Sequence, residues 1–250
     1  CNGAFEDVQR MKENTYNEYA DAYVSMLDRE DTQRFSFSRD WLIPALLEMV
    51  GDVAGLHALD AGCGEGRIAR LLSDRGAHVV GVDVSASLIE HARKRSVGYD
   101  IQFRAEDLSS EEAKLDTKVD LIVSHLVLDD VPDYRGFIRS LSRLSKGNSR
   151  FVVSKNNPYS AVIREKAQHY FDSGVAVKYR GLSSHGVSVF YYHRTLEEYI
   201  SAFAEEGYLL RTFSDLKPPA PRNGEAGHPN HEEYERYTRF PFFCAMEFVR

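Results

Sequence analysis

The apolar residues of this chain fall into two kinds of run. Short continuous runs predict buried strands over 56–61, 78–84, 101–104, 119–124, 150–154, 208–213 and 242–249. Runs spaced by three or four residues predict helices between them, with Ser85 and Thr195 as N-caps. Strands that alternate with helices predict crossover connections and a mostly parallel sheet covered on both faces.

Three segments depart from this alternation. Residues 1–51 contain two predicted helices, the first with a face of tyrosines whose default role is packing. Residues 157–194 are rich in aromatic residues and histidines and are too long for a plain connection. We expect them to form an insertion, part helix and part hairpin, over the carboxyl ends of the strands. The Pro- and Gly-containing stretch 217–231 predicts an extended loop.

The composition limits the class of protein. A chain of 250 residues with 43% hydrophobic residues suits a single domain, 1–250. A net charge of −7 disfavours a nucleic-acid partner without excluding one. The three cysteines, Cys1, Cys63 and Cys244, are odd in number and widely spaced, which argues against a disulfide framework or a metal site. No apolar run is long enough to cross a membrane and the polar start lacks a signal-peptide core, so we expect a cytoplasmic protein without a membrane partner.

A glycine-rich turn joins the first predicted strand to the following helix. It reads D-A-G-C-G-E-G over residues 60–66, so glycine stands at every second position and a ligand can touch the main chain. Asp60 points to a ligand with positive charge or hydroxyls. The third glycine comes one residue too early for a dinucleotide fingerprint, where Arg67 stands instead, and no Gly-Lys-Ser/Thr follows for a P-loop.

Acidic residues mark the ends of the next two strands. Asp83 ends the second strand, where a carboxylate can take both hydroxyls of a ribose. Glu106 and Asp107 follow the third strand, where an acid can accept a hydrogen bond from an adenine amino group. Together with Asp60, these acids suit an adenosine that carries a cation and suit a pyrophosphate poorly.

These motifs resemble those of class I S-adenosylmethionine-dependent methyltransferases. Residues 60–66 resemble the D-x-G-x-G-x-G motif of that family, and V-D-V-S at 82–85 resembles its V-D-x-S. A-E-D-L at 105–108 resembles its adenine-side segment, and 119–124 its fourth strand. The likeness runs from about residue 16 to the end and is strongest over 56–132.

The resemblance implies an α/β fold of the Rossmann-like, three-layer type. Its seven-stranded sheet would be mostly parallel with an antiparallel last strand, preceded by N-terminal helices and with the insertion after the fifth strand. Residues 1–51 would form a helical lid, and the insertion at 157–194 part of the acceptor pocket.

The resemblance also implies S-adenosyl-L-methionine as the cofactor, with S-adenosyl-L-homocysteine as its product. Gly62 and Gly64 would lie against the methionine part, and Ser124 with His125 beside the sulfonium. The implied cofactor-binding residues are Tyr23, Asp60, Gly62, Cys63, Gly64, Asp83, Val84, Glu106, Asp107, Leu108, Ser124 and His125.

Within the family, the motifs of this chain most resemble those of the methyltransferases that act on small molecules. Y-H-R-T at 192–195 and E-G-Y at 206–208 resemble its "YHRP" and "AGF". Where that branch usually has L-H-H or L-H-Y, this chain has Leu128-Asp129-Asp130 and lacks the histidine. The candidate catalytic residues are therefore His125 and Asp129. The alternative for His125 is a histidine satisfied by backbone contacts, and for Asp129 an acid that caps a helix or faces solvent.

The predicted function is methyl transfer to nitrogen, oxygen or carbon of a small molecule, such as a natural product or metabolite, by in-line displacement. A general base is needed only for an acceptor that is protonated at the working pH. Two alternatives stay open: methylation of a tRNA base or a peptide, which predicts a basic rim, and a protein that binds S-adenosylmethionine or S-adenosylhomocysteine without transfer. The acceptor and the oligomeric state are left open.

Overall fold

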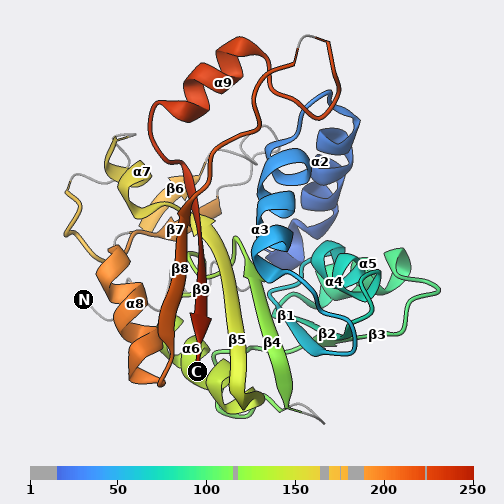
Figure 1. Ribbon diagram of the computed structural model, residues 1–250. Helices are drawn as coiled ribbons and strands as arrows, with labels where there is room; N and C mark the ends of the chain where they lie inside the picture. Colours follow the sequence, from blue (N-terminus) through green and yellow to red (C-terminus); the bar gives the residue numbers. More distant parts are fainter. Residues whose placement is uncertain (1–15, 115–117, 164–168, 175, 180–188, 223) are drawn as a thin grey trace.

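The computed structural model describes residues 16–114, 118–163, 169–174, 176–179, 189–222 and 224–250 (Figure 1). A seven-stranded sheet runs through it in the order β3-β2-β1-β4-β5-β9-β8. Its strands are β1 (His57–Ala61), β2 (His78–Asp83), β3 (Ile101–Ala105), β4 (Val119–His125), β5 (Ser145–Asn156), β8 (Leu209–Asp215) and β9 (Phe243–Val249).

The strand directions confirm the predicted topology. β3, β2, β1, β4 and β5 pair in parallel, whereas β9 pairs antiparallel with both β5 and β8. Only β5 is much longer than predicted. It starts at Ser145, directly after a helix, and its polar first half pairs at Val119 before a register shift.

Helices cover both faces of the sheet (Figure 1). They are α3 (Ile43–Val50), α4 (Arg67–Ser73), α5 (Ala86–Arg95), α6 (Tyr134–Leu144) and α8 (Leu196–Glu205), and α2 (Ala20–Thr32) packs on the outside of α5. Successive strand residues face opposite sides, so Leu121 and Val123 pack with α3, α4 and α5, while Ile122 packs with α6 and α8. The predicted caps are present: Ser85 accepts from Leu88 N, and Thr195 forms a capping box.

The second predicted helix begins with a wide turn. Ser38–Leu42 (η1) is π-helical and leads into α3, whose second residue is Pro44. A proline has no N–H and its ring crowds the carbonyl four residues earlier, so the chain here departs from regular α-helical pairing.

Shorter elements lie beyond the carboxyl ends of the parallel strands (Figure 1). They are α7 (Pro158–Ile163), an antiparallel pair of strands, β6 (Ala176–Tyr179) and β7 (Val189–Tyr192), and α9 (His231–Thr238). α9 was not predicted from the sequence, although Asn230 and Glu233 form a capping box at its start. Within the described ranges, no helix is both long and apolar enough to span a bilayer.

Candidate functional site

A cavity of about 360 Å³ opens at the carboxyl ends of β1, β2 and β4. Parallel strands end at one edge of the sheet, so the loops that follow them meet there. The cavity is bordered by the glycine turn, the residues after β2, β3 and β4, and the N-terminal segment. Of the predicted site residues, Tyr23, Asp60, Gly62, Cys63, Gly64, Asp83, Val84, Glu106, Asp107, Leu108 and His125 line it.

The glycines of the turn serve different purposes. Gly62, Gly64 and Gly66 all have positive φ, at 80°, 53° and 83°. A Cβ at Gly62 would lie 2.4 Å from a side-chain carbon of Val127, and one at Gly66 would lie 2.9 Å from the ring of Phe103. Only at Gly64 would a Cβ meet nothing within 4 Å. Gly62 and Gly66 therefore allow close packing, and Gly64 leaves main chain open to the cavity.

Asp60 is a buried carboxyl without a partner. Its exposed fraction is 1%, and neither carboxylate oxygen has a hydrogen-bond partner in the described parts of the chain. Its pKa is raised to about 7, mainly by burial; Asp83 and Glu65 also raise it, while the nearby Ala69 amide and Arg70 lower it. An unpaired buried carboxylate is costly, so this position favours a cation or a hydrogen-bond donor in the cavity.

Asp83 is held rigidly at the end of β2. Its two oxygens accept hydrogen bonds from Gly64 N and Ser85 N, each at 2.9 Å. Burial raises its pKa, and these two hydrogen bonds oppose the rise. Each carboxylate oxygen can accept more than one hydrogen bond, so Asp83 keeps acceptor capacity for a ligand.

One ring nitrogen of His125 faces a serine hydroxyl, and the other has no partner among the described residues. Its Nδ1 lies 2.6 Å from Ser154 Oγ, and its buried Nε2 has no partner among the described residues. Burial lowers the pKa of His125 to about 4, with Arg67 contributing, so the ring is neutral at neutral pH. Ser124 is not among the described residues that line the cavity, because neighbouring residues of a strand face opposite sides.

The residue after His125 has an unusual backbone conformation. Leu126 has a φ of 57°, the one positive value for a residue other than glycine within the described ranges. Such a conformation costs about 1–2 kcal/mol in a residue with a Cβ. Leu126 N donates to Ser154 O at 2.8 Å, so the turn is fixed against β5, which also supplies the partner of His125. The sequence carried no signal for this turn.

Asp129 lies behind the cavity wall. It is 3% exposed, and its Oδ1 accepts from Tyr199 OH and faces Lys155 Nζ, both at 2.8 Å. Its Oδ2 accepts from the backbone N and the side-chain Nδ2 of Asn156, at 2.9 and 3.1 Å. Asn156 lines the cavity, so Asp129 is positioned to orient that amide. Its direct catalytic role stays a prediction that this placement does not favour.

The next residue, Asp130, does line the cavity. Tyr16 OH donates to Asp130 Oδ2 at 2.6 Å, and the ring of Tyr16 meets that of Tyr23 edge-on at 6.4 Å between centroids. The Tyr16–Asp130 contact joins residues 114 positions apart. Glu30, which the sequence did not single out, also lines the cavity; it comes from α2 and belongs to no local motif.

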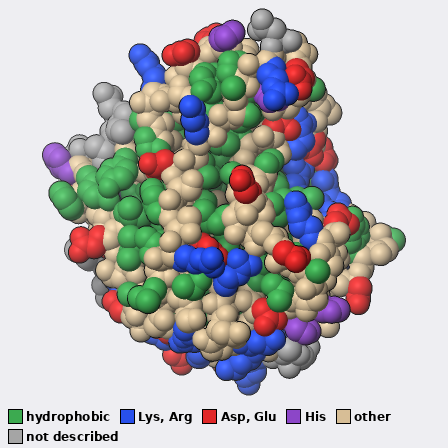
Figure 2. Space-filling model, viewed as in Figure 1, with side chains coloured by type: hydrophobic (Ala, Val, Ile, Leu, Met, Phe, Trp, Pro, Cys, Tyr) green, Lys and Arg blue, Asp and Glu red, His purple; other side chains and the backbone are tan. Residues whose placement is uncertain are grey.

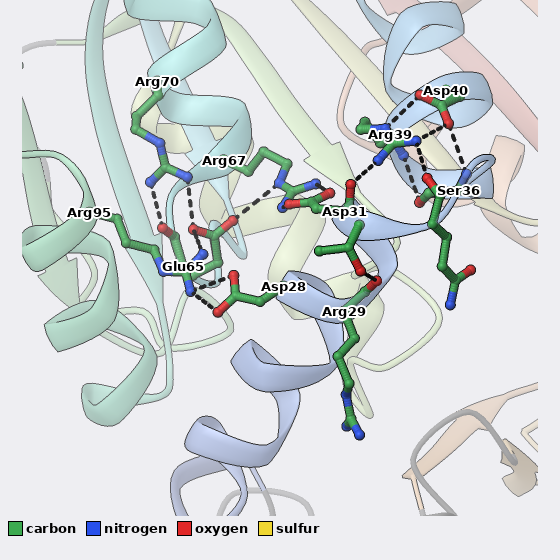
Figure 3. Close-up of polar contacts among 12 residues, drawn as sticks. Asp28, Arg29, Asp31, Ser36, Arg39, Asp40, Glu65, Arg67, Arg70 and Arg95 are labelled. Carbon is green, nitrogen blue, oxygen red and sulfur yellow. Dashed lines mark hydrogen bonds and ion pairs between the residues drawn. The ribbon is translucent and has the colours of Figure 1, made fainter. Parts of the chain in front are cut away.

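An ionic network joins the glycine turn to α2 (Figure 3). Glu65 is 2% exposed and faces the guanidinium groups of three arginines: Arg70 at 2.8 Å, Arg67 at 3.4 Å and Arg95 at 3.6 Å. From α2, Asp31 pairs with Arg67 at 2.5 Å and Asp28 pairs with Arg95 at 2.8 Å. Ion pairs therefore connect α2 to the glycine turn that borders the cavity.

Comparison with known proteins finds relatives of this chain. The family described as Methyltransferase domain matches residues 52–209. The ubiquinone biosynthesis O-methyltransferase of Coxiella burnetii is 28% identical over 158 residues, 55% of this chain and 66% of that protein. The protein of the same name from Aeromonas salmonicida is 27% identical over 120 residues, 47% of this chain and 49% of that protein. The matched part thus spans less than two thirds of these relatives.

Solved structures share the fold. An S-adenosylmethionine-dependent methyltransferase from Mesorhizobium loti superimposes with a TM-score of 0.68 at 23% identity, covering 83% of this chain and 96% of that one. Magnesium protoporphyrin IX methyltransferase from Synechocystis, with bound S-adenosylhomocysteine, gives 0.63 at 16% identity and covers 96% and 99%. A methyltransferase from Haloferax volcanii, in complex with the Trm112 activator, gives 0.66 at 17% identity and covers 95% and 96%.

Proposed function

Because the chain belongs to the methyltransferase-domain family, we propose that it transfers the methyl group of S-adenosyl-L-methionine to a small-molecule acceptor, leaving S-adenosyl-L-homocysteine. One observation carries the proposal: the unpartnered buried carboxylate of Asp60 stands beside the open main chain of Gly64 in a single cavity. An amino-acid portion with an ammonium group fits that combination, because it offers both a cation and atoms that approach main chain closely.

The remaining predicted residues contact the ribose and the adenine of the cofactor. Asp83 accepts the ribose hydroxyls with the acceptor capacity left by its two backbone hydrogen bonds. Glu106, Asp107 and Leu108 follow β3 and border the adenine. Tyr23 comes from α2 and lines the cavity, and we assign the described residues 16–51 to the lid; residues 1–15 of the predicted lid lie outside the described residues.

The main contribution of this chain to the reaction is to hold the two reactants in position. The cofactor, when bound, supplies a methyl group on a sulfonium, which is a good leaving group. The walls of the cavity hold the acceptor in line with that methyl group, which accounts for much of the acceleration. Neutral His125 offers Nε2 as a hydrogen-bond acceptor when its Nδ1 carries the proton toward Ser154.

A small acceptor is supported by the shape and lining of the site. The cavity wall includes aromatic residues from three separate segments, Phe37, Tyr191 and Phe243, and apolar rings suit such walls. Part of the insertion at 157–194 therefore borders the acceptor. The relatives named ubiquinone biosynthesis O-methyltransferases also point to a small molecule. Acidic and basic side chains alternate over the face seen in Figure 2, which gives no support for tRNA there.

We place the protein in a reducing compartment such as the cytoplasm. Cys63 and Cys244 are free and buried, and burial raises the pKa of both thiols, so neither is poised for disulfide chemistry.

Calorimetric titration with S-adenosylhomocysteine tests the cofactor assignment, and an acceptor screen with methyl-labelled S-adenosylmethionine tests transfer. We expect saturable binding that is lost or strongly weakened in Asp60→Ala. Binding without transfer to any acceptor class would favour a non-methylating protein. Binding of a nicotinamide dinucleotide instead would refute the proposal.

A further inference from the structure

We propose that Asn156 determines which acceptors bind: its side-chain Oδ1 accepts a hydrogen bond from an N–H or O–H group of an aromatic acceptor. Asp129 and Lys155 are positioning residues that hold Asn156 for this contact. The inference rests on the proposed function and specifies its acceptor. The hydrogen bond keeps the acceptor in place and takes no part in the transfer itself.

The orientation of the Asn156 amide follows from its partner. Asn156 Nδ2 lies 3.1 Å from Asp129 Oδ2, and Asp129 Oδ1 faces Lys155 Nζ at 2.8 Å. A carboxylate beside an ammonium group only accepts hydrogen bonds, so the amide turns its NH2 group toward Asp129 and its oxygen away. Asn156 Oδ1 has no partner among the described residues and is not enclosed by them. Because Asn156 lines the cavity, this oxygen is available to a ligand there.

The buried ion pair holds Asn156 at three atoms. Asn156 N and Nδ2 both donate to Asp129 Oδ2, and Lys155 Nζ donates to Asn156 O at 2.6 Å. Lys155 is 1% exposed and lies 4.3 Å from the centre of the Tyr199 ring, whose hydroxyl donates to Asp129. A buried ion pair adds little net stability, because removing both charges from water offsets their attraction. Its effect here is to fix the amide before a ligand arrives.

The register of three adjacent strands places Asn156 beside two other lining residues. Asn156 ends β5 and pairs directly with Phe243 of β9, so their side chains share a face. His125 ends β4 and pairs with Ser154, whose Oγ lies 2.6 Å from His125 Nδ1. Ser154 and Asn156 are alternate residues of one strand, so they share that face about 6.6 Å apart. His125, Asn156 and Phe243 therefore follow one another along the edge of the sheet, and all three line the cavity.

This part of the edge lies outside the proposed cofactor contacts. The residues proposed for the methionine, ribose and adenine follow β1, β2 and β3, whereas the sheet continues past β4 to β5 and β9. Asn156 and Phe243 are thus on the far side of β4 from those residues. A ligand group held at Asn156 therefore belongs to the acceptor.

An apolar wall adjoins Asn156. Phe243, its partner across the strands, stacks on Phe37 with 5.9 Å between ring centroids. Leu126 packs in the same cluster, and its N donates to Ser154 O at 2.8 Å. Phe37, Leu126 and Phe243 all line the cavity. Such a wall favours an aromatic ligand, and a ligand that lacks a donor would leave Asn156 Oδ1 desolvated without a hydrogen bond.

Two pairs of isosteric ligands that differ in the donor test the inference. Indole has an N–H where benzofuran has an oxygen atom, and phenol has an O–H where fluorobenzene has a fluorine atom. Each is titrated into protein saturated with S-adenosylhomocysteine and followed by ligand-observed NMR, which detects weak binding without turnover. We expect indole and phenol to bind roughly 5- to 10-fold more tightly than their counterparts.

Two variants and a matched control assign the preference. Asn156→Leu removes the acceptor oxygen at similar volume, and should reduce the preference to about 2-fold or less. The double variant Asp129→Asn/Lys155→Met removes the ion pair without leaving a lone buried charge, and should reduce the preference likewise. In the control, Arg150→Met/Glu247→Gln removes a 3.0 Å ion pair that also joins β5 to β9 but does not line the cavity. The preference should persist there.

The positioning role has a second readout in the wild-type protein. The side-chain NH2 signals of Asn156, assigned by their absence in Asn156→Leu, should be protected from exchange with water before any ligand is added. An amide that exchanges freely, or a preference that survives in Asp129→Asn/Lys155→Met, would remove the positioning role.

Equal binding within each pair, no measurable binding of indole or phenol, or a preference that survives in Asn156→Leu would each overturn the inference. In those cases binding of S-adenosylhomocysteine would leave the proposed function standing. Loss of S-adenosylhomocysteine binding in Asn156→Leu alone would assign Asn156 to the cofactor and also overturn the inference. Failure of S-adenosylhomocysteine to bind the wild-type protein would remove the proposed function and this inference with it.

Discussion

Replacing Asp60 by asparagine should stabilise the protein in the absence of cofactor. The carboxyl is 1% exposed and unpartnered in the described structure, and burial raises its pKa from 3.8 to about 7. The folded state therefore binds this proton more tightly than the unfolded state. Stability from this group is fully present below the unfolded pKa and is lost as the pH rises through the folded pKa.

The magnitude follows from the difference between the two pKa values. A shift of about 3 units at about 1.4 kcal/mol per unit gives a penalty of about 4 kcal/mol for the ionised group. Asp60→Asn should therefore exceed the wild type by about 1.5 kcal/mol at about pH 5 and by about 4 kcal/mol at about pH 8. Water that enters the cavity would solvate the carboxylate, so both figures are upper limits.

Urea unfolding of cofactor-free protein, followed by circular dichroism at the two pH values, measures this difference. Asp107→Asn is the control, because Asp107 is exposed and the variant makes the same change in charge. It should shift the free energy of unfolding by less than about 0.5 kcal/mol at either pH. An Asp60→Asn effect that is equal at both pH values would show that the carboxyl titrates normally and would refute the reasoning.

Four further variants concern the end of β2, the glycine turn and the N-terminal helix. Asp83→Asn should weaken S-adenosylhomocysteine binding by roughly 10- to 100-fold in calorimetry, because a charged acceptor for the ribose is lost. Gly62→Ala should lower the free energy of unfolding by about 2–4 kcal/mol in urea, since positive φ and overlap with a neighbouring side chain add together. Gly64→Ala, which meets open space, should cost only about 1 kcal/mol but weaken cofactor binding. Asp31→Asn should speed amide hydrogen exchange in α2 while costing less than about 1 kcal/mol, because its ion pair with Arg67 is partly exposed.

Each of these has a result that would contradict it. Unchanged affinity in Asp83→Asn would remove that residue from the ribose site. Equal destabilisation by the two alanine variants would mean that the contact at Gly62 is relieved by a small shift. Unchanged exchange in α2 would show that apolar packing alone holds the helix.

The sheet was predictable because most of its strands are apolar runs that can be identified from the local sequence alone. The apolar runs at 78–84 and 119–124 need burial on both faces, and the glycine turn and Asp83 place the cavity at one edge of the sheet. The first half of β5 was missed because it is polar and is held by pairing with β4. α9 was missed because no residue on it is buried, so it lacks an apolar face.

The acceptor end of the site was less predictable for a physical reason. The contact of Tyr16 with Asp130 depends on how two distant segments pack, and the spacing of residues within either segment does not predict it. Similarly, the sequence singled out Asp129, yet the chain turns at Leu126 so that Asp129 is enclosed by Tyr199 and Lys155 while its neighbour Asp130 lines the cavity.

The position of β9 bears on the order in which the molecule can assemble. β9 is hydrogen-bonded to β5 on one side and to β8 on the other, so β8 has no neighbour in the sheet until β9 is in place. Because β9 follows β8 along the chain, β8 cannot join the described sheet before β9 has been made and has paired with β5. Until then the β5 edge is uncovered, and an uncovered strand edge is open to wrong strand pairing.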